Sequence, residues 1–135
     1  MMNKNNIECF CCSGKKYSDC CQKFHLGGVP SSIVELMRSR YSAYAIGLVD
    51  YILKTSYQLP KSMRKLEAMR KEIMNFSNFT VFQGLEIIDF NQSEDSGWVI
   101  FHAILKQNDK DASFKEKSYF IKLDGRWLYT HGDIF

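Results

Sequence analysis

All five cysteines of this 135-residue chain lie between positions 9 and 21. Cys9 and Cys11 form one close pair, Cys20 and Cys21 form another, and the eight residues between the pairs include Gly14 and two lysines. A loop of this length can fold back and present four sulfurs to one ion, because glycine permits a tight reversal of the backbone. Zinc favours a closed tetrahedral shell of thiolates, so the spacing predicts a structural zinc site.

The charge of the segment agrees with this interpretation. Four thiolates around Zn²⁺ carry a formal charge of minus two, which Lys15 and Lys16 offset. A disulfide cluster is the alternative, but an odd number of cysteines cannot pair completely. Residues 1–6 contain no apolar run of the kind a signal peptide needs, so we expect a cytoplasmic location, where disulfides are rare.

The cysteine segment resembles the SEC-C motif, a zinc-binding tail of the bacterial preprotein translocase ATPase and of many other bacterial proteins. The motif usually reads Cys-Pro-Cys-Gly-Ser-Gly-Lys-Lys-Tyr-Lys-x-Cys-Cys/His. The resemblance implies a metal shell made by Cys9, Cys11, Cys20 and Cys21, with Ser13, Gly14, Lys15, Lys16 and Tyr17 matching the loop between them. Phe10 stands in the position of the proline and Cys12 in that of the first glycine.

Two further donors leave other ligand sets open. Cys12 adds a fifth thiol that can compete for the metal or become oxidised. His25 follows Cys21 by four residues and can replace it, because the adjacency of Cys20 and Cys21 strains simultaneous ligation. We favour the set of four cysteines over any set that uses Cys12 or His25.

Composition limits the class of protein. The hydrophobic content of 45% is typical of a soluble globular chain. No apolar run approaches the roughly 18 residues of a membrane span, so we expect no membrane-spanning segment. A net charge of +3 does not by itself indicate binding to nucleic acid or to an anionic membrane.

The first half of the remaining chain has helical patterns. Turn and breaker residues make 22–30 a linker. Ser32 and Glu35 then form a capping box, and the helix they start stops at Gly47. A second helical segment runs from Val49 to Pro60, and a third covers residues 61–76, whose basic side chains we interpret as a solvated face balanced by nearby glutamates.

The second half has strand patterns. Segments rich in β-branched and aromatic residues cover 80–90, 98–106, 114–123 and 126–131, with Gly84 as a possible bulge and Asp124-Gly125 as a hairpin turn. Helices followed by an antiparallel meander indicate an α+β domain, with helices on one face of a curved sheet.

This order of elements, together with several local motifs, resembles the YchJ family. The matching segments are Leu36–Tyr44, Val49–Tyr51, Glu116-x-Ser118-x-Phe120 and Asp124-Gly125-Arg126-Trp127-x-Tyr129. The resemblance implies two parts, a SEC-C zinc knuckle at 1–26 and a conical domain similar to nuclear transport factor 2 at 27–135. The family is a set of bacterial proteins without a characterised role, so it implies the fold more than the function.

Two sets of side chains in the conical domain are candidate functional residues. Arg38 and Arg40 either bind a carboxylate or phosphate, or pair with a strand carboxylate such as Glu116; we favour the pairing.

His102 lies in a strand that is apolar on both faces, which predicts that both sides of the sheet are covered. We expect it on the outer face as a structural residue. Asp50, Asp89 and Asp133 are the remaining candidate carboxylates, and the sequence brings none of them to His102, so we assign no catalytic residue.

The sequence therefore favours a non-enzymatic zinc protein that docks a protein partner. The translocase motif docks a secretion chaperone and contacts lipid and ribosome, so the resemblance implies a chaperone or a secretion- or translation-related partner. The docking surface would be displayed by Lys15, Lys16, Tyr17, Lys23 and Phe24. The alternatives are a small-molecule-binding or catalytic conical domain, with the knuckle as accessory, and an RNA-binding surface, which the charge does not favour. A homodimer is compatible with either function.

Overall fold

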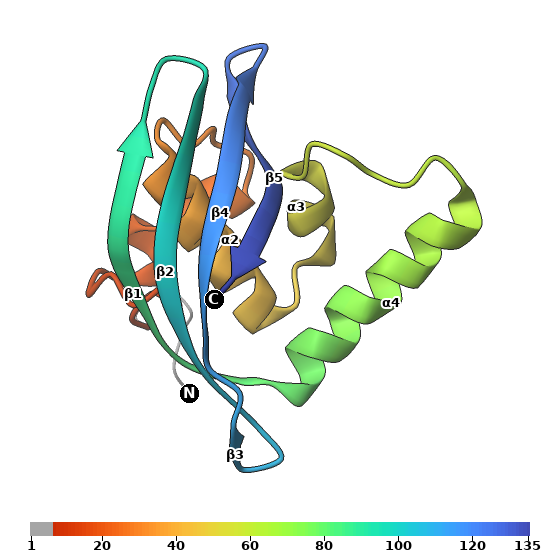
Figure 1. Cartoon of the computed structure of the whole chain (residues 1–135). Helices are drawn as coiled ribbons and strands as arrows, with labels where there is room; N and C mark the ends of the chain where they lie inside the picture. Colours follow the sequence, from red (N-terminus) through yellow and green to blue (C-terminus); the bar gives the residue numbers. More distant parts are fainter. Residues whose placement is uncertain (1–6) are drawn as a thin grey trace.

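The computed structural model describes residues 7–135 (Figure 1). A cysteine-rich segment with a short 3-10 turn, η2, leads through four α-helices into an antiparallel sheet. The elements in chain order are η2 (Tyr17–Asp19), α1 (Gln22–His25), α2 (Ile33–Ile46), α3 (Val49–Lys54), α4 (Met63–Phe79), β1 (Val81–Gln92), β2 (Ser96–Gln107), β3 (Lys110–Asp111), β4 (Phe114–Leu123) and β5 (Arg126–Ile134).

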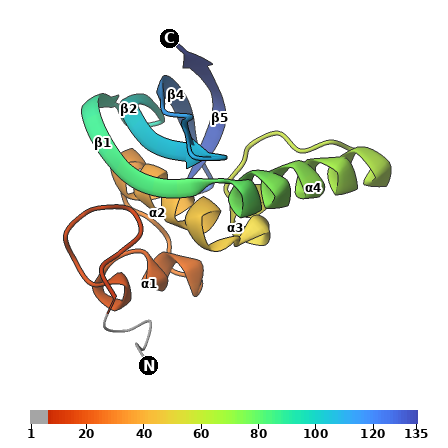
Figure 2. The same ribbon diagram turned by 90° about the horizontal axis from the view of Figure 1, so that it is seen from below.

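Helix α2 begins and ends where the sequence predicts. The Ser32 hydroxyl accepts a hydrogen bond from the Glu35 amide at 3.2 Å, and Gly47 closes the helix in the left-handed conformation, with φ of 78°. Both devices satisfy backbone groups that a helix end leaves without a partner. The α2 side chains are buried on several sides, because the helix lies between the sheet and the cysteine-rich segment (Figure 2).

Two boundaries differ from the prediction. The expected linker at 22–30 contains α1, which begins immediately after Cys21. Helix α3 ends at Lys54, well before Pro60, because the hydroxyl of Thr55 donates to the Tyr51 carbonyl at 2.8 Å. Side-chain bonds of this kind compete with continued helix formation.

The sheet has the strand order β1-β2-β4-β5, and all pairs are antiparallel. The turn between β4 and β5 uses Asp124 and Gly125 with φ of 51° and 79°, as the Asp-Gly hairpin signal predicts. The predicted bulge is confirmed, since the register of β1 shifts between Phe82 and Gly84. The two-residue strand β3, which pairs with β2, was not predicted.

The sheet bends around the helices (Figure 2), and the main core fills its concave side. Apolar residues from α2 and from the inner positions of the strands pack there. The buried members are Ile33, Leu36, Met37, Tyr41, Leu85, Val99, Phe101, Ala103, Leu105, Phe120 and Trp127. The α+β prediction, with helices on one face of a curved antiparallel sheet, is therefore confirmed.

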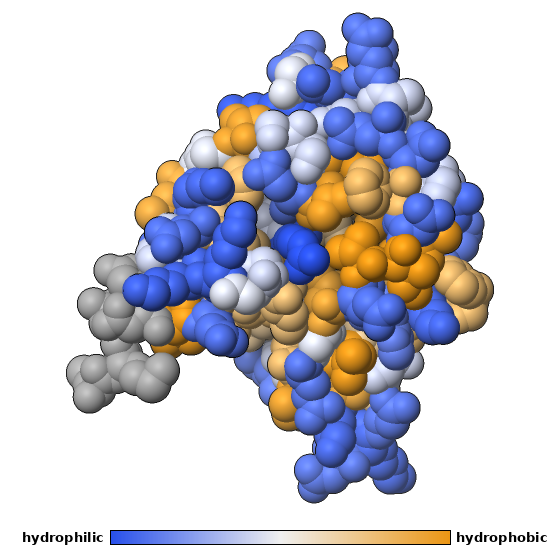
Figure 3. Space-filling model, turned by 90° about the vertical axis from the view of Figure 1, so that its left-hand side faces the viewer, coloured by the Kyte–Doolittle hydropathy of each residue, from blue (hydrophilic) through white to orange (hydrophobic). Residues whose placement is uncertain are grey.

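The outer face of the sheet is less buried than the sequence predicts. In β2, Val99 and Phe101 are buried, whereas His102 is half-buried and Ile104 is exposed. Hydrophobic side chains also gather on the side of the molecule shown in Figure 3. The predicted outer position of His102 is confirmed, but the expected cover over this face is absent from residues 7–135. The homodimer stays a prediction, and this is the face it would use.

No helix among residues 7–135 combines the length and the apolar character needed to cross a membrane.

Candidate metal centre

The loop between the two cysteine pairs folds back on itself. The Cys9 amide donates to the Lys15 carbonyl at 2.8 Å, and the Tyr17 amide donates to the Ile7 carbonyl at 2.8 Å. Gly14, with φ of 86°, makes the reversal that these bonds require. As a result, the sulfur atoms of four cysteines from the two ends of the loop lie within 4.8 Å of one another: Cys9, Cys11, Cys20 and Cys21.

The separations between the sulfurs fit a tetrahedral ion. The Cys20 sulfur lies 3.6 Å from that of Cys11 and 3.9 Å from that of Cys21. Four Zn–S bonds of about 2.3 Å place neighbouring sulfurs about 3.8 Å apart. All five cysteines are free, so the disulfide alternative is wrong. The cluster can therefore hold a metal ion, and a zinc ion with four thiolates would act as a structural clamp with no open position for substrate.

The cluster excludes Cys12. Cys9, Cys11 and Cys21 are buried and Cys20 is half-buried, whereas Cys12 is exposed. The thiol of Cys12 donates to the Phe10 carbonyl at 3.7 Å, and its backbone has φ of 63°, a conformation that favours glycine. This explains why the SEC-C pattern has glycine at this position.

Without an ion, the thiols share protons through hydrogen bonds. Bonds from Cys21 and Cys9 lower the pKa of Cys11, and the bond to Cys11 raises the pKa of Cys9 to about 11. The bond to Cys11 is also the main reason that the pKa of Cys21 is raised. Zinc displaces thiol protons when it binds, so these shared protons are the ones an ion would release. The Ser13 hydroxyl, 3.2 Å from the Cys20 sulfur, contributes one more hydrogen bond at the centre.

His25 has a structural position beside the cluster. Its Nδ1 lies 2.6 Å from the Tyr17 hydroxyl and its Nε2 lies 2.9 Å from the Ser39 carbonyl. A carbonyl only accepts, so Nε2 carries the proton and Nδ1 accepts from Tyr17. Burial lowers the pKa of His25, which favours this neutral form. With both nitrogens engaged, His25 joins the cysteine-rich segment to α2 and leaves the ligand positions to cysteine.

Other anchors fix the cysteine-rich segment to the conical domain. Arg38 of α2 donates to the Cys11 carbonyl at 2.9 Å. Tyr17 packs within the cysteine cluster, and Phe24 packs into a second core with Ala43 and Ile52. The expectation that Tyr17 and Phe24 are displayed is wrong, because they are only 4% and 7% exposed. They serve as the buried side of the segment.

We expect the variant His25→Ala to keep its metal and lose stability. The substitution leaves the Tyr17 hydroxyl and the Ser39 carbonyl without their partner, at a cost of about 1–3 kcal/mol in the free energy of unfolding. The check is metal content together with urea unfolding, and Gln22→Ala in the same helix is the control. A loss of bound metal in His25→Ala would show that His25 is a ligand.

Arg40 differs from the prediction in its partner. Its Nη1 donates to the Ile52 carbonyl at 3.0 Å and to the Thr55 hydroxyl at 2.6 Å, and its guanidinium lies 4.6 Å from the centre of the Tyr129 ring. No ion pair with Glu116 forms among residues 7–135. Arg40 thus anchors α2 to α3 and to the sheet through neutral groups. The predicted carboxylate pair is wrong, because the Ile52 carbonyl and the hydroxyls of Thr55 and Ser56 accept from the guanidinium instead.

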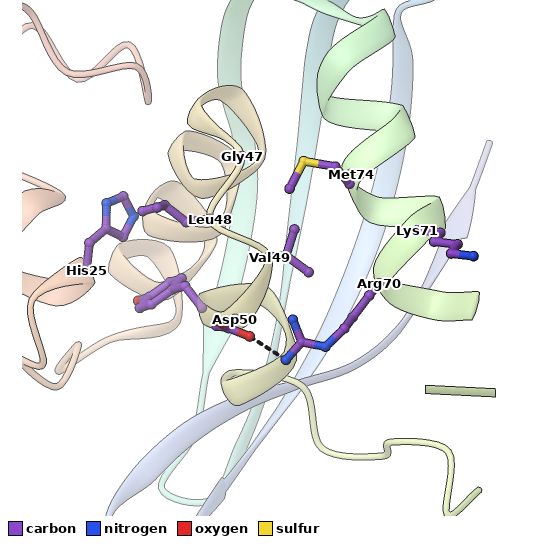
Figure 4. A pocket seen from close by; sticks show the side chains of 9 residues that line it. His25, Gly47, Leu48, Val49, Asp50, Arg70, Lys71 and Met74 are labelled. Atoms are coloured by element: carbon purple, nitrogen blue, oxygen red, sulfur yellow. Dashed lines mark hydrogen bonds and ion pairs between the residues drawn. The ribbon is translucent and has the colours of Figure 1, made fainter. Parts of the chain in front are cut away.

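Two hollows adjoin the helices. An open crevice lies between α3 and α4, where Asp50 and Arg70 face each other and form an ion pair of 2.5 Å (Figure 4). A cavity of about 480 Å³ lies between α2, α4 and the concave face of the sheet. The cavity contains tyrosines, Arg40 and Glu116, but neither histidine nor aspartate lines it.

The candidate catalytic residues are not brought together. His102 stands opposite Glu86 and Lys115 in the sheet, whereas Asp89 pairs in register with Ile100 and Asp133 with Lys117. Asp50 belongs to the crevice between α3 and α4. His102 therefore shares no site with these aspartates among the described residues. The crevice that contains Asp50 is also lined by His25, but both ring nitrogens of His25 are engaged by Tyr17 and Ser39.

Comparison with known proteins agrees with the fold and with the cysteine cluster. Residues 32–132 match the family model described as "YchJ, middle NTF2-like domain". A UPF0225 protein of Actinobacillus succinogenes is 34% identical over 129 residues, which cover 93% of this chain and 81% of the relative.

Two solved structures are similar over most of the chain. The solution structure of a SEC-C motif containing protein from Rhodopseudomonas palustris has a TM-score of 0.81 and 29% identity, and the match covers 96% of this chain and 99% of that one. The crystal structure of a SEC-C motif containing protein from Psychrobacter arcticus has a TM-score of 0.70 and 25% identity, with 91% and 75% covered. The chain therefore belongs to the YchJ family of UPF0225 proteins and has an α+β, NTF2-like fold.

Proposed function

We propose that the protein is a zinc-binding docking adaptor without enzymatic activity. The zinc ion is held by Cys9, Cys11, Cys20 and Cys21, and residues 1–26 act as the docking part while 27–135 form the supporting domain. The observation that carries this proposal is the cluster of four sulfurs, which is fixed to α2 on one side and faces solvent through its lysine loop on the other.

The exposed side of the knuckle has a consistent chemistry. Lys15, Lys16 and Lys23 are exposed, and Leu26 is 80% exposed beside them in the chain. A basic surface with one apolar side chain complements an acidic protein segment that also carries an apolar residue. The buried anchors hold this surface in one conformation, so little ordering is needed when a partner binds.

The nature of the partner rests on the SEC-C resemblance. The related motif of the translocase ATPase docks a secretion chaperone and contacts the ribosome, so we propose a partner in secretion or translation. The location that this implies is the cytoplasm. RNA is the weaker alternative, because a net charge of +3 does not by itself indicate binding to nucleic acid. If the lysines contacted phosphates, association would fall steeply with salt concentration.

The test compares two charge-reversal variants. The first, Lys15→Glu with Lys16→Glu, changes the knuckle, and the second, Lys61→Glu with Lys65→Glu, makes the same change in charge at exposed positions in and just before α4. Each protein is used to capture partners from a bacterial lysate treated with nuclease. We expect a protein that the wild type and the α4 variant retain and the knuckle variant loses, and this binding should be reproduced with the purified partner.

Equal capture by both variants would contradict docking through the knuckle. Loss of all captured proteins after nuclease treatment would favour the RNA alternative.

A further inference from the structure

The cavity under the sheet has a long apolar wall and a polar end. Its volume is about 480 Å³, which is the size range of pockets for small organic molecules. The wall is made of aliphatic and aromatic side chains from α2, α4 and the inner face of the sheet: Met37, Ile73, Phe76, Phe82, Phe101 and Leu105. The polar end contains Arg40, Glu116, Ser118 and Tyr129, and the exposed Glu72 of α4 lines the cavity as a second carboxylate.

Arg40 is a buried charge that forms no ion pair within the described residues. It lines the cavity, is 6% exposed and has no carboxylate within ion-pair distance among residues 7–135. Its bonds to Ile52, Thr55 and Ser56 all use Nη1, so Nε and Nη2 have no acceptor in the described part of the chain. A guanidinium in this state favours an anion that reaches its free edge, because burial penalises an uncompensated charge.

Glu116 places the opposite charge at the same end of the cavity. Its carboxylate accepts a hydrogen bond from the Ser118 hydroxyl and a longer one of 3.5 Å from the Tyr129 hydroxyl. Both donors are neutral, and no cation lies within ion-pair distance of Glu116 among residues 7–135. Arg40 and Glu116 therefore face one cavity without forming an ion pair among residues 7–135, although they are close enough to attract each other electrostatically.

We propose that this cavity binds a small zwitterion with an apolar body, in which a carboxylate meets Arg40 and an amine meets Glu116. A simple organic acid would be repelled by Glu116, and a simple amine would be repelled by Arg40. A molecule with both groups satisfies both charges, and its apolar part contacts the aromatic wall. Apolar α-amino acids and their close derivatives have this chemistry. The inference concerns the conical domain and is independent of docking by the knuckle.

The test uses three compounds that share one ring and differ only in charge. They are L-phenylalanine, 3-phenylpropionate, which lacks the amine, and 2-phenylethylamine, which lacks the carboxylate. Binding to the full chain is measured by calorimetric titration and by shifts of cavity resonances in NMR spectra. We expect L-phenylalanine to bind at least about tenfold more tightly than either analogue, since loss of one buried charge contact removes that much or more.

A variant identifies the group that binds the amine. Glu116→Gln should lose the preference for L-phenylalanine and bind 3-phenylpropionate at least as well, while Glu86→Gln, an exposed change on β1, should behave as the wild type. A change in preference cannot arise from loss of folding, which would abolish all binding. Equal binding of all three compounds, tighter binding of either analogue to the wild type, or no binding at millimolar concentration would overturn the proposal.

Discussion

Removal of zinc is expected to unfold the knuckle and to weaken the conical domain beneath it. The knuckle is too small to bury a core without an ion, and its stability depends on the four sulfurs. Phe24 packs between α2 and α3, so its release opens the second core as well. Loss of a buried aromatic contact costs about 3 kcal/mol, which for a chain of this size lowers Tm by roughly 10 °C.

The measurement is thermal unfolding with and without a zinc chelator, together with NMR spectra of the chelated protein. Cys20→Ser with Cys21→Ser should reproduce the effect of the chelator. Cys12→Ser is the matched control, because Cys12 is exposed and lies outside the cluster. If chelation leaves Tm and the resonances of residues 7–26 unchanged, zinc does not stabilise the knuckle.

Arg40→Ala is expected to destabilise the protein by about 2–4 kcal/mol. The change removes the donor to the Thr55 hydroxyl, one of the donors to the Ile52 carbonyl and the contact with the Tyr129 ring. It also enlarges the cavity at its polar end. The effect should appear in urea unfolding as a lower midpoint.

Arg64→Ala is the control for Arg40→Ala, because Arg64 is exposed on α4 and has no bond to another part of the described chain. We expect its effect to stay within about 0.5 kcal/mol. An effect this small for Arg40→Ala would mean that the guanidinium makes no net contribution to stability. The free-energy cost of burying it would then equal the free energy gained from its contacts.

Local chemistry explains which parts of the fold the sequence predicts. The capping box of Ser32 and Glu35 and the turn at Asp124 and Gly125 each act within four residues, so the chain carries the whole signal. The same holds for the cysteine loop, whose glycine and spacing bring the sulfurs together. Even β4 was predicted with its observed limits, because turns bound it on both sides.

Contacts between residues far apart in the sequence explain the features that the sequence did not predict. Arg38 donates to a carbonyl 27 residues away, and a backbone acceptor leaves no signal in side-chain identity. The sequence predicted that Tyr17 and Phe24 are exposed on a docking surface. Both are buried, because their burial depends on how the knuckle packs against α2. His25 likewise bonds to the Ser39 backbone carbonyl, which no side chain signals. Ser42 was not singled out, yet its hydroxyl contacts His25, and a small polar residue inside an apolar helical stripe is the one signal for such a contact.

The most direct test of the account is the metal itself. Protein purified under reducing conditions is analysed for its elemental content, and X-ray absorption at the zinc edge gives the ligands. The account predicts one zinc per chain, bound by four sulfurs at about 2.3 Å. Protein that contains no stoichiometric zinc, or zinc whose shell includes a nitrogen in place of a sulfur, would contradict it.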